Sequence, residues 1–280
     1  MRSTASLLTF CLLGSLLTGC QQAPKEHDQL DAVLWTQTSI EHELLYRQVY
    51  AAATRQLQPA LADPQWDALA QPPRDLTGLP PALIVDIDET LLDNTPVNAK
   101  SVVDGGAYDY AEWYRWVEKA EARALPGSVA FMQEAAKLGI TPYYLTNREP
   151  GQEADTLRNL RQAGFPIADE GQILTAGTAI GGCQQAGSDK TCRRQWVGER
   201  ARVLLLVGDS YGDFIAAPNR LSEQRKAVTP YQAWFGQRWF LLPNPTYGGW
   251  YTAPYGDRDE LPDAQKRALK HKALIQPQEQ

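Results

Sequence analysis

Short apolar runs separated by longer amphipathic segments divide the central part of the chain. Runs at residues 82–85, 140–146 and 203–207 have the length and composition of buried strands. Helical patterns of about a dozen residues occupy 126–138, 151–163 and 190–200. Strands that alternate with helices of this length predict an α/β fold with a doubly wound parallel sheet. In such sheets, ligands bind beyond the carboxyl ends of the strands.

A further helix is predicted before the first strand. Thr38 to Glu41 has the pattern of a capping box. Apolar residues then recur at helical spacing to about Gln58, where Pro59 is expected to end the helix. This stripe either packs against the main core or forms the wall of a small cap.

The remaining segments complete the predicted layout. Residues 94–108 are expected to form a polar loop that leads into a helix, so that 94–124, together with 38–58, supplies a small, mainly helical cap. The main domain is predicted at 38–262. Residues 263–280 are charged and polar, which predicts a C-terminal tail with a solvated helix.

The N-terminus has the layout of a secretory signal. Arg2 gives it a basic start, and the apolar stretch 7–17 is too short to span a bilayer. Its end at Leu-Thr-Gly-Cys20 resembles the bacterial lipobox, in which the cysteine becomes the acylated first residue. We therefore expect a lipoprotein signal peptide at 1–19, lipidation of Cys20 and a flexible tether at 20–37. The alternative is an ordinary cleaved signal with an incidental cysteine.

Composition limits the partners of the mature chain. Removal of residues 1–19 leaves 261 residues, enough for one large domain. It also removes one basic residue, Arg2, and leaves 26 basic against 33 acidic side chains, a net charge of −7. No basic run interleaved with aromatic residues occurs, which argues against a nucleic-acid polymer as the main partner.

Two cysteines lie outside the signal and its lipobox. Cys183 and Cys192 are nine positions apart in a chain that we expect to be exported. An oxidising compartment favours a disulfide between them. Two free thiols are the alternative.

Polar residues follow each of the three predicted strands. The residues are Asp86 and Asp88; Thr146 and Asn147; and Asp209 and Asp213, with Lys190 on the segment before the last strand. The carboxyl ends of parallel strands meet at one edge of a sheet, so these side chains are expected to converge. For the first pair alone, a strand that simply ends in an acidic turn is an equal alternative.

Phosphoryl transfer is the chemistry that suits this set. Asp86 can attack phosphorus as a nucleophile, and Asp88 can first protonate the leaving oxygen and then activate water. Thr146, Asn147 and Lys190 can hold the phosphate oxygens. Two carboxylates about 4 Å apart repel by roughly 4 kcal/mol at an effective dielectric of 20, so the cluster requires a divalent cation. Hard oxygen ligands favour Mg²⁺.

Four motifs in the chain resemble those of the haloacid dehalogenase (HAD) superfamily. They are Asp-Ile-Asp-Glu-Thr, Leu-Thr-Asn-Arg, Ser-Asp-Lys and Gly-Asp-Ser-Tyr-Gly-Asp, in the order of the family. The lipobox, Glu-Trp-Tyr-Arg-Trp-Val and the segment that ends in Leu-Pro-Asn-Pro-Thr-Tyr-Gly-Gly-Trp are similar to class C acid phosphatases, which are outer-membrane lipoproteins that act on nucleotide monophosphates. The resemblance spans roughly residues 38–255.

This resemblance implies an Mg²⁺-dependent acid phosphatase or 5′-nucleotidase with a HAD-like core, anchored in the outer membrane by its N-terminal lipid and facing the periplasm or the cell surface. It implies Asp86 and Asp209 as metal ligands, Asp88 as a ligand through its backbone carbonyl, and Asp213 as support for the metal site. Trp113 and Tyr247 match positions that sandwich the base or the aromatic leaving group of the substrate.

Several assignments have alternatives. Trp113 and Tyr247 could be core packing, Lys190 could be a surface lysine with Arg193 and Arg194 as the phosphate contacts in its place, and Arg148 could be structural. A non-catalytic lipoprotein that binds a ligand or adheres to a partner on the same fold is the alternative function. The oligomeric state is left open, a homodimer included.

Other phosphatase chemistries lack their motifs. None of the three histidines lies in an Arg-His-Gly context, and neither Cys183 nor Cys192 begins a Cys-x5-Arg loop. No Gly-x4-Gly-Lys-Ser/Thr loop marks a nucleoside triphosphatase.

Overall fold

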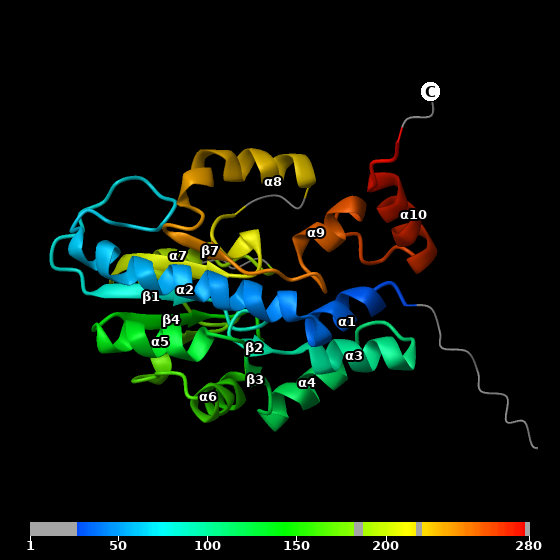
Figure 1. Ribbon diagram of the computed structural model, residues 1–280, viewed down its shortest axis with the longest axis horizontal. Coiled ribbons are helices and arrows are strands. Elements are labelled where there is room, and N and C mark those ends of the chain that lie inside the picture. Colours follow the sequence, from blue (N-terminus) through cyan, green and yellow to red (C-terminus); the bar gives the residue numbers. More distant parts are fainter. Residues whose placement is uncertain (1–26, 182–186, 217–219, 278–280) are drawn as a thin grey trace, which may run out of the picture.

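One parallel five-stranded sheet forms the centre of the computed structural model, which describes residues 27–181, 187–216 and 220–277 (Figure 1). The strand order is β5-β4-β1-β6-β7. The strands are β1 (Pro81–Val85), β4 (Thr141–Leu145), β5 (Ile173–Leu174), β6 (Arg202–Gly208) and β7 (Trp239–Leu241). The predicted parallel α/β sheet is confirmed.

The register of the sheet brings the ends of three strands to one level. Val85 of β1 lies opposite Tyr144 of β4 and Val207 of β6. The residues that follow these three positions therefore emerge at the same edge, as the strand pattern predicts.

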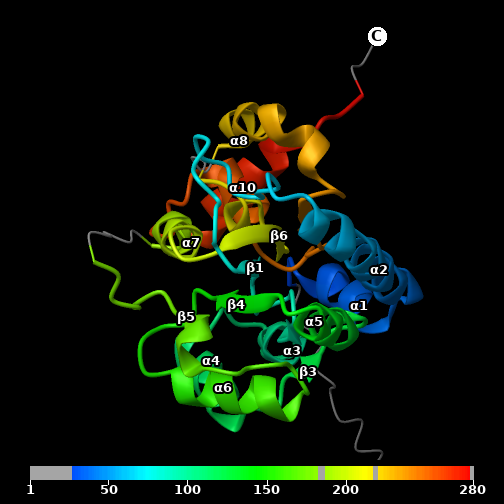
Figure 2. The ribbon, with the colours of Figure 1, turned by 90° about the vertical axis from the view of Figure 1, so that its left-hand side faces the viewer.

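Helices cover both faces of the sheet. The helices are α1 (Leu30–Thr38), α2 (Ile40–Ala62), α3 (Thr95–Asp104), α4 (Tyr110–Lys119), α5 (Ser128–Lys137), α6 (Glu153–Gln162), α7 (Thr191–Gly198), α8 (Leu221–Val228), α9 (Gly249–Thr252) and α10 (Asp263–Ala273). In Figure 2, α2 and α5 lie on one side of the sheet and α7 on the other.

Successive residues of β1 alternate between two apolar clusters, as successive side chains of a strand must. Leu83 and Val85 pack into the cluster that contains α2 and α5, whereas Ala82 and Ile84 pack into the cluster on the α7 face. Both faces of β1 are thus buried, which is why its sequence is continuously apolar up to Asp86.

Helix α2 belongs to the core and not to a cap. Tyr46, Tyr50 and Leu57 are buried in the same cluster as Val85 of β1. The predicted apolar stripe packs against the core only in part, because Leu57 is buried whereas Leu44 and Leu45 are exposed. The position of the helix in the core corrects the assignment of 38–58 as a cap element.

The ends of α2 also differ from the prediction. The residue that caps the N-terminus of the helix is Ser39 and not Thr38, the first residue of the predicted box. The Ser39 hydroxyl accepts the hydrogen bond from the His42 N–H at 3.1 Å. At the other end it continues through Pro59 to Ala62. Arg202 of β6 donates to the carbonyl oxygens of Ala60 and Leu61, both at 3.0 Å, and so satisfies groups that a helix end leaves without partners.

Two segments that were expected to lack regular structure are helical. Leu30–Thr38, within the predicted tether, forms α1, whose Val33 is buried and which packs against α3. Thr95–Asp104, within the predicted loop, forms α3, with a proline in its first turn and Gly105 in the left-handed conformation at its end. Cys20 and residues 20–26 lie outside the described residues.

A small layer beside the main sheet contains α3, α4 and a two-stranded antiparallel sheet of β2 (Leu92–Asp93) and β3 (Arg123–Ala124). Asp109 caps α4 by accepting the Ala111 N–H at 2.8 Å. Residues 94–124 therefore contribute a mainly helical unit, and α10 supplies the helix predicted in the C-terminal tail. Over the described part of the chain, the helices are too short or too polar to cross a membrane.

Candidate active site

Three aspartates form a compact acidic cluster at the carboxyl edge of the sheet. Asp86 directly follows β1, and Asp209 and Asp213 follow β6. Asp86 and Asp213 are buried, and one carboxylate oxygen from each of the three lies within 4.8 Å of the others. The structure therefore joins residues that are more than 120 positions apart in the sequence.

Lys190 belongs to this cluster. Its side chain is buried, and its Nζ donates to Asp86 and, at 2.7 Å, to Asp213. Burial lowers the pKa of Lys190, but the carboxylates of Asp213 and Asp86 outweigh this effect and raise it. The alternative of a surface lysine is therefore wrong.

The buried carboxylates are electrostatically strained. Burial raises the pKa of Asp86 to about 7, although the ammonium of Lys190 opposes the shift. Burial also raises the pKa of Asp209 well above its usual range, and the charges of Asp86 and Asp213 add to the shift. One ammonium thus compensates the cluster only in part, which is the condition that favours a further cation.

Asp88 faces a different set of donors. Arg148 approaches its carboxylate from Nε at 3.0 Å and from Nη2 at 2.8 Å, and Thr146 Oγ1 and Asn94 Nδ2 donate at 3.0 and 2.9 Å. Arg148 is buried, so this is a shielded ion pair. Arg148 therefore positions the predicted acid/base, and Asn94 is a further contact of Asp88 that was not predicted from the sequence.

The arginines of α7 organise the other strand ends. Arg193 is fully buried and donates to the Thr146 carbonyl and, at 2.8 Å, to Asn147 Oδ1. Because Oδ1 accepts this bond, the amide nitrogen of Asn147 remains as the donor for a ligand. Arg194 donates to the Gly212 carbonyl at 2.7 Å. Both guanidinium groups hold the loops of the site, which corrects the expectation of them as replacement phosphate contacts.

The two predicted aromatic contacts lie next to this network. Tyr247 is 38% exposed, and its hydroxyl donates to Glu89 Oε2. The guanidinium of Arg148 lies over the Trp113 ring, 5.5 Å from its centroid. Glu89 is a further residue that was missed, although its place directly after Asp88 was a local signal.

Cys192, on the first turn of α7, is disulfide-bonded, and its predicted partner Cys183 lies outside the described residues.

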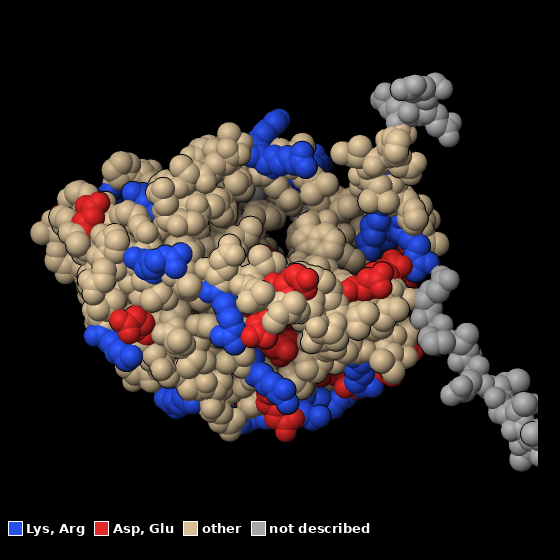
Figure 3. All heavy atoms as spheres, viewed as in Figure 1, with Lys and Arg blue, Asp and Glu red and all other residues tan. Residues whose placement is uncertain are grey.

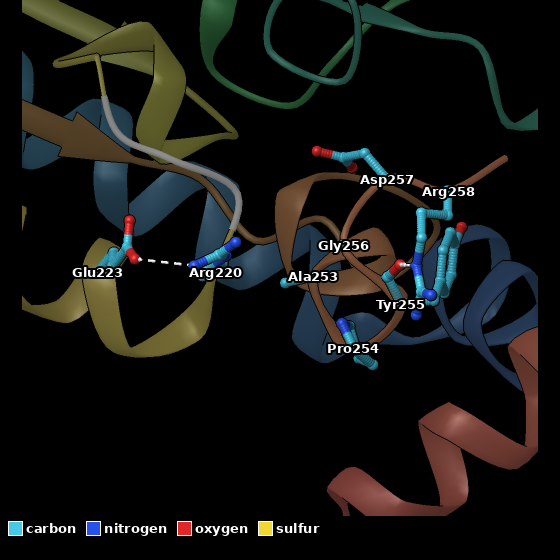
Figure 4. A pocket seen from close by; sticks show the side chains of 8 residues that line it. All are labelled: Arg220, Glu223, Ala253, Pro254, Tyr255, Gly256, Asp257 and Arg258. Atoms are coloured by element: carbon cyan, nitrogen blue, oxygen red, sulfur yellow. Dashed lines mark hydrogen bonds and ion pairs between the residues drawn. The ribbon is translucent and has the colours of Figure 1, made fainter.

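A separate cavity of about 700 Å³ lies between the start of α8 and residues 253–258 (Figure 4). None of the predicted site residues lines it, and its Arg220 pairs with Glu223.

On the face shown in Figure 3, basic and acidic side chains are interspersed and form no continuous basic stripe. The acidic cluster and Lys190 are instead largely buried. A parallel α/β sheet with such a cluster beyond its carboxyl edge is typical of enzymes that act on phosphate groups.

Comparison with known proteins identifies the family. Residues 17–250 match the family described as HAD superfamily, subfamily IIIB (acid phosphatase), and the chain belongs to this family. The structure of the class C acid phosphatase from Bacillus anthracis is similar, with a TM-score of 0.78 and 35% sequence identity over 89% of this chain and 98% of that one. The same score, with 34% identity, is found for a crystal structure of that phosphatase with tungstate bound.

More distant relatives occur in plants. The chain is 30% identical over 164 residues to acid phosphatase 1 of Solanum lycopersicum and 25% identical over 165 residues to the stem 28 kDa glycoprotein of Glycine max. These matches span 57% and 58% of the lengths of the two plant proteins, and 59% of this chain.

Proposed function

We propose that this protein hydrolyses phosphomonoesters through an aspartyl-phosphate intermediate on Asp86, with Mg²⁺ as its cation. The observation that carries the proposal is the position of Asp86, buried at the end of β1 between Lys190 and the carboxylates of Asp209 and Asp213. A carboxylate needs no separate base to act as a nucleophile. Membership of the acid phosphatase family and the tungstate bound to the similar Bacillus protein, a tetrahedral oxyanion like phosphate, support it.

In the first half of the reaction, a carboxylate oxygen of Asp86 attacks phosphorus while the bond from phosphorus to the ester oxygen breaks. Asp88 gives its proton to the leaving oxygen. Lys190 and the amide nitrogen of Asn147 are the donors that face the transferred group. Thr146 Oγ1 donates to Asp88 in this structure, so a bound phosphate would compete with Asp88 for that hydroxyl.

In the second half, water attacks phosphorus, Asp88 takes the proton of that water, and the bond from phosphorus to the Asp86 oxygen breaks. Asp88 thereby recovers the proton that it gave away, and Asp86 returns to its carboxylate form. Arg148 is bonded to Asp88 through two nitrogens. Arg148 therefore holds the carboxyl group of Asp88 in place for both proton transfers.

The residues present fit a divalent cation. Three carboxylates supply hard oxygen donors within 4.8 Å of one another, the ligand type that Mg²⁺ prefers. Asp86, Asp209 and Asp213 would hold the ion, and Asp88 would add its backbone carbonyl, as the family resemblance implies. When bound, Mg²⁺ would neutralise charge on the phosphate oxygens.

We further propose that the substrates are nucleotides or other aromatic monophosphates. Tyr247 presents a partly exposed ring beside Glu89, and the Trp113 ring lies under the guanidinium of Arg148, which binds Asp88. Two aromatic side chains near a phosphate site favour a flat leaving group, since ring stacking contributes about 0.5–1.5 kcal/mol per pair.

We also propose that the protein acts outside the cytoplasm, attached to the outer membrane through acylated Cys20. The support is the signal layout and the lipobox resemblance of residues 1–20. Metabolic labelling with a radioactive fatty acid tests this: the label should enter the wild-type chain and not Cys20→Ser. Label in both chains would refute lipidation at Cys20.

The test of the function uses a purified chain that lacks residues 1–20 and a chromogenic phosphomonoester. We expect turnover that requires Mg²⁺ and that Asp86→Asn abolishes. Asp104→Asn is the matched control, because Asp104 is an exposed residue of α3 that pairs with Lys100. Absence of Mg²⁺-dependent turnover would leave the non-catalytic lipoprotein as the better explanation, whereas equal turnover in Asp86→Asn would refute the aspartyl-phosphate intermediate.

A further inference from the structure

Glu89 is a buried residue of the loop that follows β1, and the chemistry above does not use it. Its side chain is 3% exposed, and its backbone has a φ of 55°, a region that non-glycine residues adopt only when they are held there. The Glu89 N–H donates to the Leu92 carbonyl at 2.9 Å, and the Glu89 carbonyl accepts from the Tyr46 hydroxyl. Contacts on both sides of the residue thus fix its backbone.

The carboxylate of Glu89 connects two distant segments. Oε1 accepts the Asn94 N–H at 2.9 Å, and Oε2 accepts the hydroxyl of Tyr247. Asn94 in turn donates to Asp88 Oδ1 at 2.9 Å and accepts the indole N–H of Trp116 at 2.8 Å. Glu89 therefore joins Tyr247 to the group of side chains that supports Asp88.

Tyr247 lies on a segment without regular structure between β7 and α9. The segment is held at Asn244, whose Nδ2 donates to Asp209 Oδ2 at 2.7 Å, and at Thr246, whose carbonyl accepts from Gln29 at 2.6 Å. Beyond these two contacts, the bond to Glu89 fixes the far end of the ring. A ring held in advance loses less conformational freedom when a ligand stacks on it.

The other aromatic residue is connected in a similar way. Trp113 lies under the guanidinium of Arg148, and Arg148 binds Asp88. Consecutive residues of one loop, Asp88 and Glu89, are therefore each linked to one of the two rings. A single short loop can thus align both rings with the acid/base.

We propose that Glu89 is a positioning residue that fixes the ring of Tyr247 relative to Asp88, so that the aromatic part of a monophosphate lies in register with the carboxyl group that protonates its ester oxygen. This role rests on the proposed function, because it takes Tyr247 as a contact for the leaving group. It makes Glu89 a determinant of selectivity between aromatic monophosphates and phosphate itself.

Binding to the mature protein in detergent tests the proposal without turnover. In an Asp86→Asn background with Mg²⁺, calorimetry gives the dissociation constants of adenosine 5′-monophosphate and of inorganic phosphate. Glu89→Ala and Tyr247→Phe remove the same hydrogen bond from its two ends, and each should raise the ratio of the nucleotide constant to the phosphate constant by about 3–10-fold, the loss expected for one hydrogen bond. Glu89→Gln keeps an acceptor for Asn94 and a donor for the Tyr247 oxygen, so its ratio should stay within about 2-fold of the parent.

The double variant Glu89→Ala/Tyr247→Phe separates positioning from general damage. If the two side chains act through their shared bond, its ratio should match that of either single variant. The proposal would be overturned if the effects of the two single substitutions on this ratio multiply in the double variant. It would also be overturned if the dissociation constant of the nucleotide rises no more than that of phosphate, or if the Asp86→Asn parent binds no nucleotide. If Glu89→Ala fails to fold, Tyr247→Phe decides alone, because it leaves the Asn94 N–H paired.

Failure of the proposed function has a different signature. Hydrolysis is lost or independent of Asp86 in that case, whereas the ratio of dissociation constants reports only on Glu89 and Tyr247. A protein that binds nucleotide in this way and hydrolyses nothing would keep the positioning role and refute the enzymatic one.

Discussion

Gly208 offers a direct test of how tightly the acidic cluster is packed. A Cβ at this position would lie 2.3 Å from Asp213 Oδ2 and 2.4 Å from Asp213 Cβ, well below the 3.0 Å that real contacts respect. Gly208→Ala must therefore move the Asp213 carboxylate, which accepts from the Ser210 N–H at 2.9 Å and from Lys190 at 2.7 Å. Overpacking of this kind costs about 1–3 kcal/mol, and a hydrogen bond to a charged group contributes about 1.5–3 kcal/mol.

These two costs arise from one displacement, so they are not summed, and we expect Gly208→Ala to lower the free energy of unfolding by about 2–3 kcal/mol. Urea denaturation of both chains without metal measures the difference. Gly106→Ala is the matched control, since a Cβ there meets no atom within 4 Å. The variant should also need more Mg²⁺ for half-maximal activity, because Asp213 is displaced from the cluster. Unchanged stability and an unchanged Mg²⁺ requirement would refute the packing argument.

Two further predictions concern the metal and the end of α2. Mg²⁺ at about 100 times its dissociation constant should raise the free energy of unfolding by about 2.7 kcal/mol, and Asp209→Asn should remove most of this gain, because one of three clustered carboxylates is lost. Thermal unfolding with and without chelator measures it, and an equal gain in both chains would contradict a site at Asp209. Arg202→Met should lower the free energy of unfolding by about 2–4 kcal/mol, since it leaves the carbonyls of Ala60 and Leu61 without their donor. Urea denaturation measures this as well, with Arg47→Met, on an exposed pair, as a control that should change by less than about 0.5 kcal/mol.

Where the sequence analysis failed, tertiary contacts decided the local structure. Helix α1 has one buried residue, Val33, so its own apolar pattern is too weak to separate it from a tether. Pro59 is a local stop signal, and α2 passes it because Arg202, more than 140 positions away, supplies donors to its last turn. Neither outcome follows from residues near the segment itself.

The sequence by itself determined the three central strands, their parallel direction and most of the candidate site residues, because strands buried on both faces are continuously apolar and end where polar residues begin. Asp86, Asp88, Thr146 and Asp209 could be named for that reason. The tertiary structure decided which groups meet: it placed Lys190 between Asp86 and Asp213, and it paired Arg148 with Asp88 and Arg193 with Asn147. These pairs lie tens of positions or more apart in the chain, and only the packed sheet brings their charges within hydrogen-bonding distance.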